Sequence, residues 1–157
     1  MIRWPARFEP ERCPVFVHNE LAMAAPPEAV WAWLILAELW PSWYSNSHPV
    51  VVEDGPRGEL GPGSRFRWRT FGMPFRSTIE EFVPGERIAW RGAGPGFAAY
   101  RAWYIEPRPG GCWVLTEETQ HGALARLGNL LMPNRMCEYH QLWLEALERQ
   151  ARQGPPP

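Results

Sequence analysis

Lysine is absent from this chain of 157 residues, in which all 16 basic side chains are arginines. Without lysine, the protein cannot form a lysine Schiff base with a carbonyl substrate. No apolar run approaches the roughly 18 residues of a transmembrane helix, and the N-terminus lacks the basic-then-apolar pattern of a signal peptide. We therefore expect a cytoplasmic protein without a transmembrane segment.

Cysteine is also rare, and the net charge is close to zero. Cys13, Cys112 and Cys137 are odd in number and match no zinc-site spacing, so we interpret them as reduced thiols. Three of the four histidines show no paired spacing with one another or with carboxylates, so we expect neither a metal site nor a cofactor. A formal charge of −1 disfavours nucleic-acid binding, which usually needs a concentrated basic face.

Tryptophan, by contrast, is abundant, with ten residues in the chain. Such large flat side chains either fill a core or line an apolar cavity, and composition leaves both open. The length suits a single domain. We place it at residues 15–152, after an N-terminal extension at 1–14 and before a disordered tail at 153–157. Proline and charge fill both ends, which we expect to be loosely held.

The first part of this domain predicts one strand and two short helices. Apolar residues alternate over 15–23, which is typical of a half-buried strand. Pro26 and Pro27 then open a helical segment, since proline is tolerated in the first turn. We expect Pro41 to end that helix and a short helical turn to follow over 40–44.

A meander of antiparallel strands and a long helix follow. Glycine and proline recur between short apolar runs, as expected for hairpins. The last element extends from about residue 124 to 152 and contains Pro133, which either kinks one helix or divides two. The strands that we can place are 64–70, 75–83, 86–92, 97–107 and 112–121.

The strand over 64–70 has two different faces. Phe66 and Trp68 point to one side, whereas Arg65, Arg67 and Arg69 point to the other. The arginine row is either a solvated outer face that keeps the sheet soluble or a binding stripe for an acidic partner.

Several segments carry a resemblance to a known superfamily. They are LAMAAPPEAVWAWL, LWPSWY, GPGSRF, FVPGERIAW and GGCWVLTEETQHG. In this order they resemble the START-like (SRPBCC) superfamily, and most closely its polyketide cyclase/dehydrase and lipid-transport family, over residues 15–150. The resemblance implies an α+β, helix-grip (Bet v 1-like) fold. About seven antiparallel strands would curve around a long C-terminal helix, with two short helices after the first strand and an elongated cavity between sheet and helix.

One hairpin can be registered from the sequence. If Pro109 and Gly110 form a two-residue turn, paired positions sum to 219, because the turn fixes the register. Arg101 then lies opposite Glu118, on the face that points inward. The same register pairs Trp103 with Thr116 and Ile105 with Val114.

The Arg101–Glu118 pair has a chemical and a structural interpretation. Arg101 could donate to a carbonyl or enolate while Glu118, or His140 on the long helix, moves a proton. These three residues are our candidate catalytic groups. Alternatively, Arg101 and Glu118 form a self-satisfied ion pair, and His140 is a hydrogen-bonded core residue.

The residues that we expect to contact a ligand are those on inward phases of the strands and the long helix. They could form an aromatic box with polar edges, or the tryptophans could simply fill the core. They are Asn19, Phe66, Trp68, Trp90, Trp103, Thr116, Met136, Tyr139 and Trp143.

Three functions remain open. We favour binding or transport of a small hydrophobic molecule, aromatic, polyketide-like or lipid, because no catalytic motif stands out. The second is a cofactor-independent cyclase, aromatase or dehydratase that uses Arg101 and Glu118. The third is a protein-partner module that docks through the arginine row or an exposed tryptophan patch. A homo-oligomer also stays open.

Overall fold

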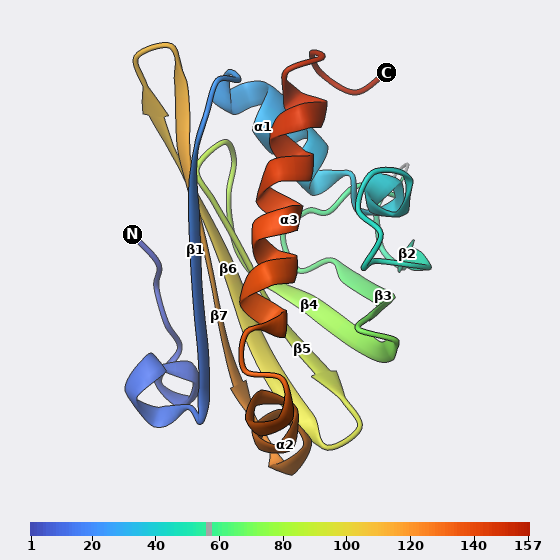
Figure 1. The fold of residues 1–157 in the computed structure, drawn as a ribbon. Coiled ribbons are helices and arrows are strands. Elements are labelled where there is room, and N and C mark those ends of the chain that lie inside the picture. The colour runs from blue at the N-terminus through green and yellow to red at the C-terminus, as the bar shows by residue number, and fades with distance from the viewer. Residues whose placement is uncertain (56–57) are drawn as a thin grey trace.

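The computed structural model describes residues 1–55 and 58–157, and one seven-stranded antiparallel sheet organises them (Figure 1). The strand order is β1-β7-β6-β5-β4-β3-β2. Strands β2 to β7 therefore form a meander, and β1 pairs with β7 at its edge. The strands are β1 (Val15–Met23), β2 (Val50–Val52), β3 (Arg65–Thr70), β4 (Met73–Val83), β5 (Arg87–Gly94), β6 (Phe97–Arg108) and β7 (Gly111–His121). The predicted α+β fold is confirmed.

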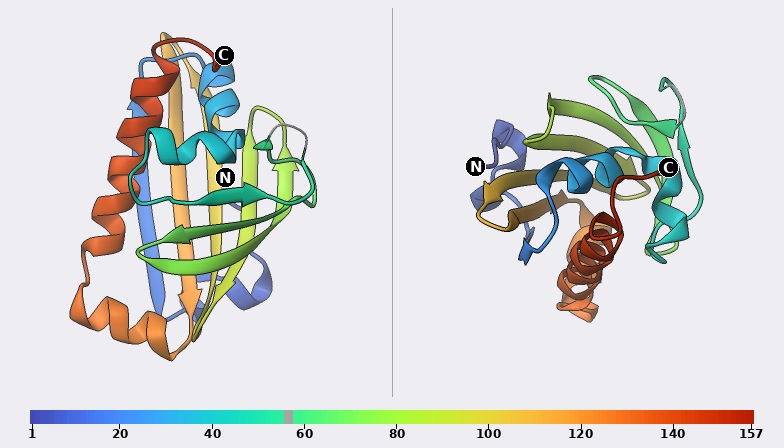
Figure 2. Two further views of the ribbon diagram at one scale, coloured as in Figure 1. Left: turned by 90° about the vertical axis from the view of Figure 1, so that its right-hand side faces the viewer. Right: turned by 90° about the horizontal axis from the view of Figure 1, so that it is seen from above.

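The sheet curves around the last helix, α3 (Arg135–Ala151), without closing into a barrel (Figure 2). Helix α1 (Pro27–Ile35) covers the same concave face near one end of α3, and α2 (Ala123–Leu131) lies at the other end. No helix among the described residues is long and apolar enough to cross a membrane.

The break at Pro133 divides two helices, α2 and α3, as one of the two alternatives predicted. The expectation for Pro41 is wrong, because α1 already ends at Ile35 and Pro41 lies inside a second short helix, Ala37–Ser42. Pro41 has no backbone N–H to donate, and the hydrogen bonds at the two ends of this helix are donated by Leu39 to the Leu36 carbonyl and by Trp43 to the Trp40 carbonyl.

The β6–β7 hairpin has the predicted register. Arg108 pairs with Gly111 around the turn, and Arg101 pairs with Glu118. Gly110 has a φ of +81°, a conformation that residues with a Cβ adopt at a cost, so the turn requires glycine there. The alternation along the two strands therefore carries both charged side chains to the concave face.

The N-terminal segment packs on the convex face of the sheet, so the expectation that it is loosely held is wrong. Phe8 is buried, and its ring stacks on Tyr100 with centroids 5.7 Å apart. The segment packs there because Tyr100 of β6 points to the outer side of the sheet, and Phe8 covers this apolar surface. At the other end, Trp33 donates to the Gly154 carbonyl over 2.8 Å. The disordered tail at 153–157 stays a prediction.

Candidate functional site

Two adjoining spaces lie between the concave face of the sheet and helices α2 and α3. The inner space, beside the middle of α3, has a volume of about 20 Å³. The outer space, beneath α2, has a volume of about 300 Å³. Four residues line both: Thr70, Phe71, Phe75 and Gln120. A molecule in the outer space therefore lies next to the groups that surround the inner one.

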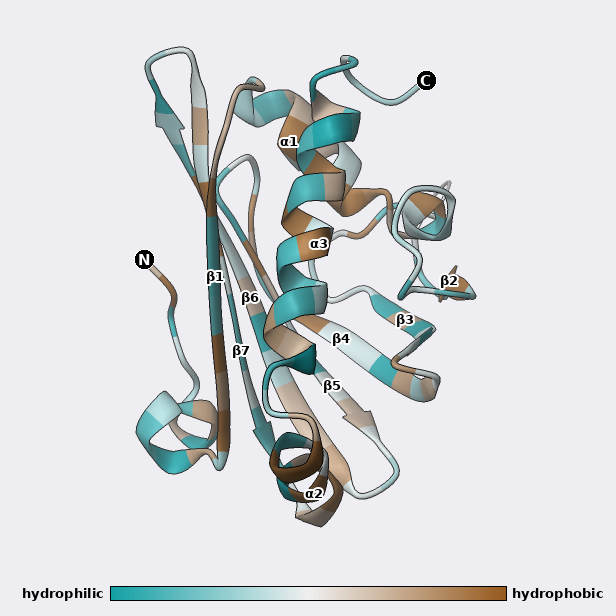
Figure 3. Cartoon of the chain, viewed as in Figure 1, coloured by the Kyte–Doolittle hydropathy of each residue, from teal (hydrophilic) through white to brown (hydrophobic). Residues whose placement is uncertain are grey.

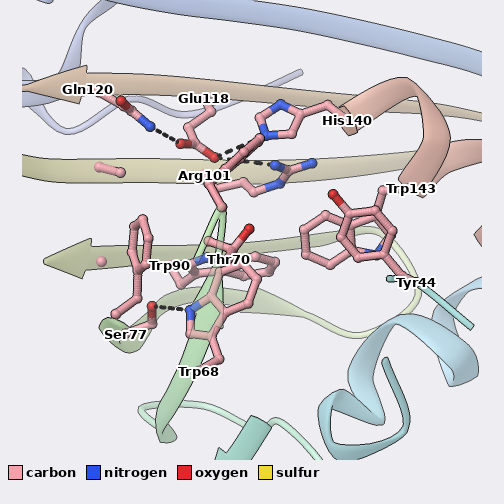
Figure 4. A pocket seen from close by; sticks show the side chains of 14 residues that line it. Tyr44, Trp68, Thr70, Ser77, Trp90, Arg101, Glu118, Gln120, His140 and Trp143 are labelled. Atoms are coloured by element: carbon pink, nitrogen blue, oxygen red, sulfur yellow. Dashed lines mark hydrogen bonds and ion pairs between the residues drawn. The ribbon is translucent and has the colours of Figure 1, made fainter. Parts of the chain in front are cut away.

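The inner space holds a buried ion pair (Figure 4). Arg101 Nη1 donates to Glu118 Oε2 over 3.2 Å, and the two residues are 2% and 8% exposed. Gln120 Nε2 donates to the other carboxylate oxygen over 2.6 Å. Both oxygens of Glu118 thus have a donor, which partly offsets the cost of burying the charge.

Arg101 retains free donors. Its guanidinium carbon lies 4.5 Å from the ring centroid of Trp143 and 4.9 Å from that of Trp103, so aromatic faces hold it in place. Within residues 1–55 and 58–157, its Nε and Nη2 atoms have no hydrogen-bond partner. Buried donors are usually paired in folded proteins, so this side chain can still bind an acceptor.

His140 completes the charged cluster from α3. Its Nε2 atom lies 3.6 Å from Glu118 Oε2. Burial lowers the pKa of His140 well below its usual value, and the positive charge of Arg101 adds to this effect. The imidazole is therefore neutral at pH 7.

Tyr44 is a second neutral group at the inner space. Burial raises its pKa to about 12, so the phenol keeps its proton at pH 7. The hydroxyl donates to the Tyr139 carbonyl over 3.2 Å and accepts from Asn46 Nδ2 over 3.2 Å.

The buried state of His140 predicts a pH-dependent stability. Below pH 6.5 the unfolded chain binds a proton at this residue that the folded chain does not, so acid favours unfolding. The free energy of unfolding should fall by up to about 1 kcal/mol between pH 6.5 and 5.5 through this group. Urea titrations at the two pH values measure this difference in the free energy of unfolding, and we expect it to be smaller by that amount in His140→Gln. An equal loss of stability between the two pH values in the wild type and in His140→Gln would contradict the prediction.

Tryptophans fill most of the space where an aromatic box was expected. The Trp143 ring centroid lies 5.0 Å from that of Trp40, 5.2 Å from Trp103 and 5.8 Å from Trp68. Trp40, which has no exposed surface, occupies the middle of this group. What remains is the inner space, whose volume suits about one water-sized group.

The outer space is larger and mostly apolar. Its walls come from the beginnings of β4 and β6, from α2 and from the first turn of α3. Leu127, on α2, lines it and is 49% exposed. Figure 3 shows α2 with hydrophobic stretches in brown beside hydrophilic ones in teal. The lining includes one charged side chain, Arg135, which also lies over the ring of Phe71.

The structure brings together some of the predicted site residues and separates others. Trp68, Trp90, Arg101, Glu118, His140 and Trp143 line the inner space, and Met136 lines the outer one. Asn19 instead donates to the Cys137 carbonyl and to Gln141 Oε1, and so ties β1 to α3. Thr116 donates to the Ala102 carbonyl. Phe66, Trp103 and Tyr139 pack outside both spaces.

Sequence reasoning missed the residues of α2. The segment 123–131 carries leucines at helical spacing, but it was interpreted only as the first part of the last helical element, kinked or divided at Pro133, and none of its residues was expected to contact a ligand. The signal that could have found it is the combination of those leucines with Gly128 and with the absence of acidic residues from 119 to 137. Thr70, Phe71 and Ser77 of the inner wall carry no comparable signal.

The outer arginine row is occupied by local partners. Arg65 pairs with Asp54 over 2.8 Å, Arg67 with Glu53 over 2.8 Å, and Arg69 donates to the Gly72 carbonyl. Such contacts fit a solvated outer face, which is one of the two interpretations that the sequence analysis gave for this row.

The sequence profile of the family described as polyketide cyclase / dehydrase and lipid transport matches residues 17–152. No curated protein matches the sequence. The crystal structure of hypothetical protein jhp0584 from Helicobacter pylori is 30% identical, with a TM-score of 0.90 over 97% of this chain and 96% of that one.

Two more distant structures share the fold. The di-domain ARO/CYC StfQ from the steffimycin biosynthetic pathway is 15% identical, with a TM-score of 0.73 over 88% of this chain and 51% of that one. A START superfamily protein from Mycobacterium smegmatis is 16% identical, with a TM-score of 0.71 over 88% of this chain and 97% of that one.

Proposed function

The chain belongs to the polyketide cyclase / dehydrase and lipid transport family, and from this we propose that it binds a small hydrophobic molecule beneath α2. The observation that carries the proposal is the apolar space of about 300 Å³ between α2 and the sheet. That volume lies at the lower end of ligand sites, which are typically concave and lined mostly by apolar side chains.

The position of the space supports binding over a purely structural gap. Leu127 and Met132 line it and are each about half exposed, at 49% and 45%, so the space borders solvent through α2. Apolar side chains that remain exposed in a concave surface are typical of sites that a ligand covers.

The second candidate function is an enzyme of the cyclase or dehydratase type. It is favoured by the cluster of Arg101, Glu118 and His140 next to the outer space. In such an enzyme, His140, which is neutral at pH 7, would remove a proton from the carbon next to the ketone of the substrate. Arg101 would stabilise the enolate that forms. Conversion of a bound polyketide-like ketone, followed by mass spectrometry and lost in His140→Gln, would favour this candidate.

A matched pair of variants tests the binding proposal. Leu127 and Leu142 are exposed to the same extent, 49% and 48%, and both lie on helices, but only Leu127 lines the outer space. We expect Leu127→Asp to weaken binding of apolar ligands about tenfold or more, because a bound apolar molecule would cover the introduced carboxylate without pairing its charge. Leu142→Asp should bind like the wild type.

The measurement is the quenching of tryptophan fluorescence on titration with fatty acids, sterols, flavonoids and polyketide-like aromatics, with native mass spectrometry to detect a co-purified molecule. Saturable binding that Leu127→Asp alone weakens would support the proposal. Binding that both variants weaken equally, or none in the wild type, would contradict it.

A further inference from the structure

We propose that the ligand is neutral and places one oxygen, the carbonyl of a ketone, ester or amide, in the inner space against Arg101, and that the ionised carboxylate analogue is excluded. The inference rests on the proposed function, since it assigns the chemical class of the molecule bound beneath α2. Three observations carry it: free donors, charge balance and size.

The donors are Nε and Nη2 of Arg101. The side chain is 2% exposed and lines the inner space, and these atoms have no partner among the described residues. Figure 4 shows the guanidinium beside Glu118, across the inner space from Trp68 and Trp90. A carbonyl oxygen has two lone pairs and no proton, so it can accept from this pair of donors.

The charges of the inner wall already balance. Arg101 and Glu118 carry one positive and one negative charge and are the charged side chains among the described residues that line this space. His140 and Tyr44 are neutral at pH 7 because burial opposes their ionisation. A carboxylate would therefore bring an uncompensated negative charge next to Glu118, in surroundings that solvate charge poorly.

The size of the inner space limits how much of the molecule can enter it. Its volume of about 20 Å³ accepts about one water-sized group. A single oxygen meets that limit, so the other substituent of the carbonyl carbon stays outside the inner space. Charge, rather than size, therefore separates the neutral carbonyl compounds from the carboxylate. The apolar body of the molecule would stay in the outer space, past the shared wall formed by Phe71, Phe75 and Gln120.

Three naphthalene probes of nearly equal shape test the inference. They are 2-acetonaphthone and 2-naphthamide, which are neutral, and 2-naphthoate, which is ionised at pH 7.5. We expect calorimetric titration of the full chain to give binding of both neutral probes and binding of the carboxylate weaker by about tenfold or more.

The decisive variant is Glu118→Gln, which keeps the shape of the side chain and removes its charge. The inner wall then carries a net positive charge, so 2-naphthoate should gain affinity relative to 2-acetonaphthone, and the preference should shrink by about tenfold. Gln120→Glu would be the reverse change, and should strengthen the preference for the neutral probes.

The outcomes separate this inference from the proposed function. Equal affinity for the neutral and ionised probes, unchanged in Glu118→Gln, would overturn the inference and leave the proposed binding function intact. A carboxylate that binds through Arg135 at the rim would give that result, and Arg135→Gln would then abolish its binding. If none of the three probes binds, both proposals are overturned.

Discussion

Arg101→Met is expected to lower the free energy of unfolding by about 3–5 kcal/mol, the usual cost of removing one partner of a buried ion pair. Glu118 would keep its negative charge at 8% exposure, and its side-chain neighbours among the described residues would be Gln120 and the neutral His140. Methionine fills much of the volume of arginine, so the loss should come from the stranded charge rather than from a cavity. Urea denaturation at pH 7.5 measures it.

The double variant Arg101→Met with Glu118→Gln is the control. Without a buried charge, the double variant should be more stable than Arg101→Met alone, by about 1 kcal/mol or more. If the second substitution destabilises the single variant further, the cost of Arg101→Met does not come from an unpaired Glu118.

Trp143→Ala is the second large effect, with an expected loss of about 3–5 kcal/mol. The indole has 1% exposure and stacks on Tyr44 with ring centroids 4.6 Å apart. It also lies under the guanidinium of Arg101 and against Trp40 and Trp103. Its removal leaves a cavity that these rings cannot fill without repacking, and it removes a cation–π contact.

Trp113→Ala provides the comparison for Trp143→Ala in thermal and urea denaturation. Trp113 is half-buried on β7, where its ring meets Tyr104 and lies near the Arg108 guanidinium. The same change of side chain should therefore cost much less, about 1 kcal/mol. Equal losses in the two variants would show that Trp143 does not hold the core together in the way described.

Local patterns were sufficient to predict most of the sheet. Strict alternation in 64–70 placed Phe66 and Trp68 inward, and both are buried in β3. The Pro109–Gly110 turn was enough to register β6 against β7 and so to bring Arg101 opposite Glu118. These features depend on neighbours along the chain or across one hairpin, and a sequence records such neighbours directly.

Features that depend on packing between distant segments were not predicted. The N-terminal segment looked loosely held, yet Phe8 finds Tyr100 on the outer face of β6, about 90 residues further along the chain. Nor could the sequence indicate that Trp40 would fill the centre of the expected aromatic box. Propensity does not reveal which large side chains share one volume.

The charged groups of the candidate site were predicted from the sequence, but the position of its apolar space was not. The charged cluster was found because hairpin register and helical spacing converge on it. The apolar space was expected around the tryptophans, but it lies beneath α2, since Trp40 and Trp143 leave only a small inner space. This arrangement places a wide apolar compartment next to a narrow polar one, which is the geometry on which the proposed ligand class depends.

The most direct test is a crystal structure of the protein with 2-acetonaphthone. We predict that the naphthalene ring lies between α2 and the sheet, with the carbonyl oxygen within about 3.2 Å of Nε or Nη2 of Arg101. Density for the ring outside the outer space, or a carbonyl group that points to solvent while Arg101 keeps its free donors, would contradict the prediction.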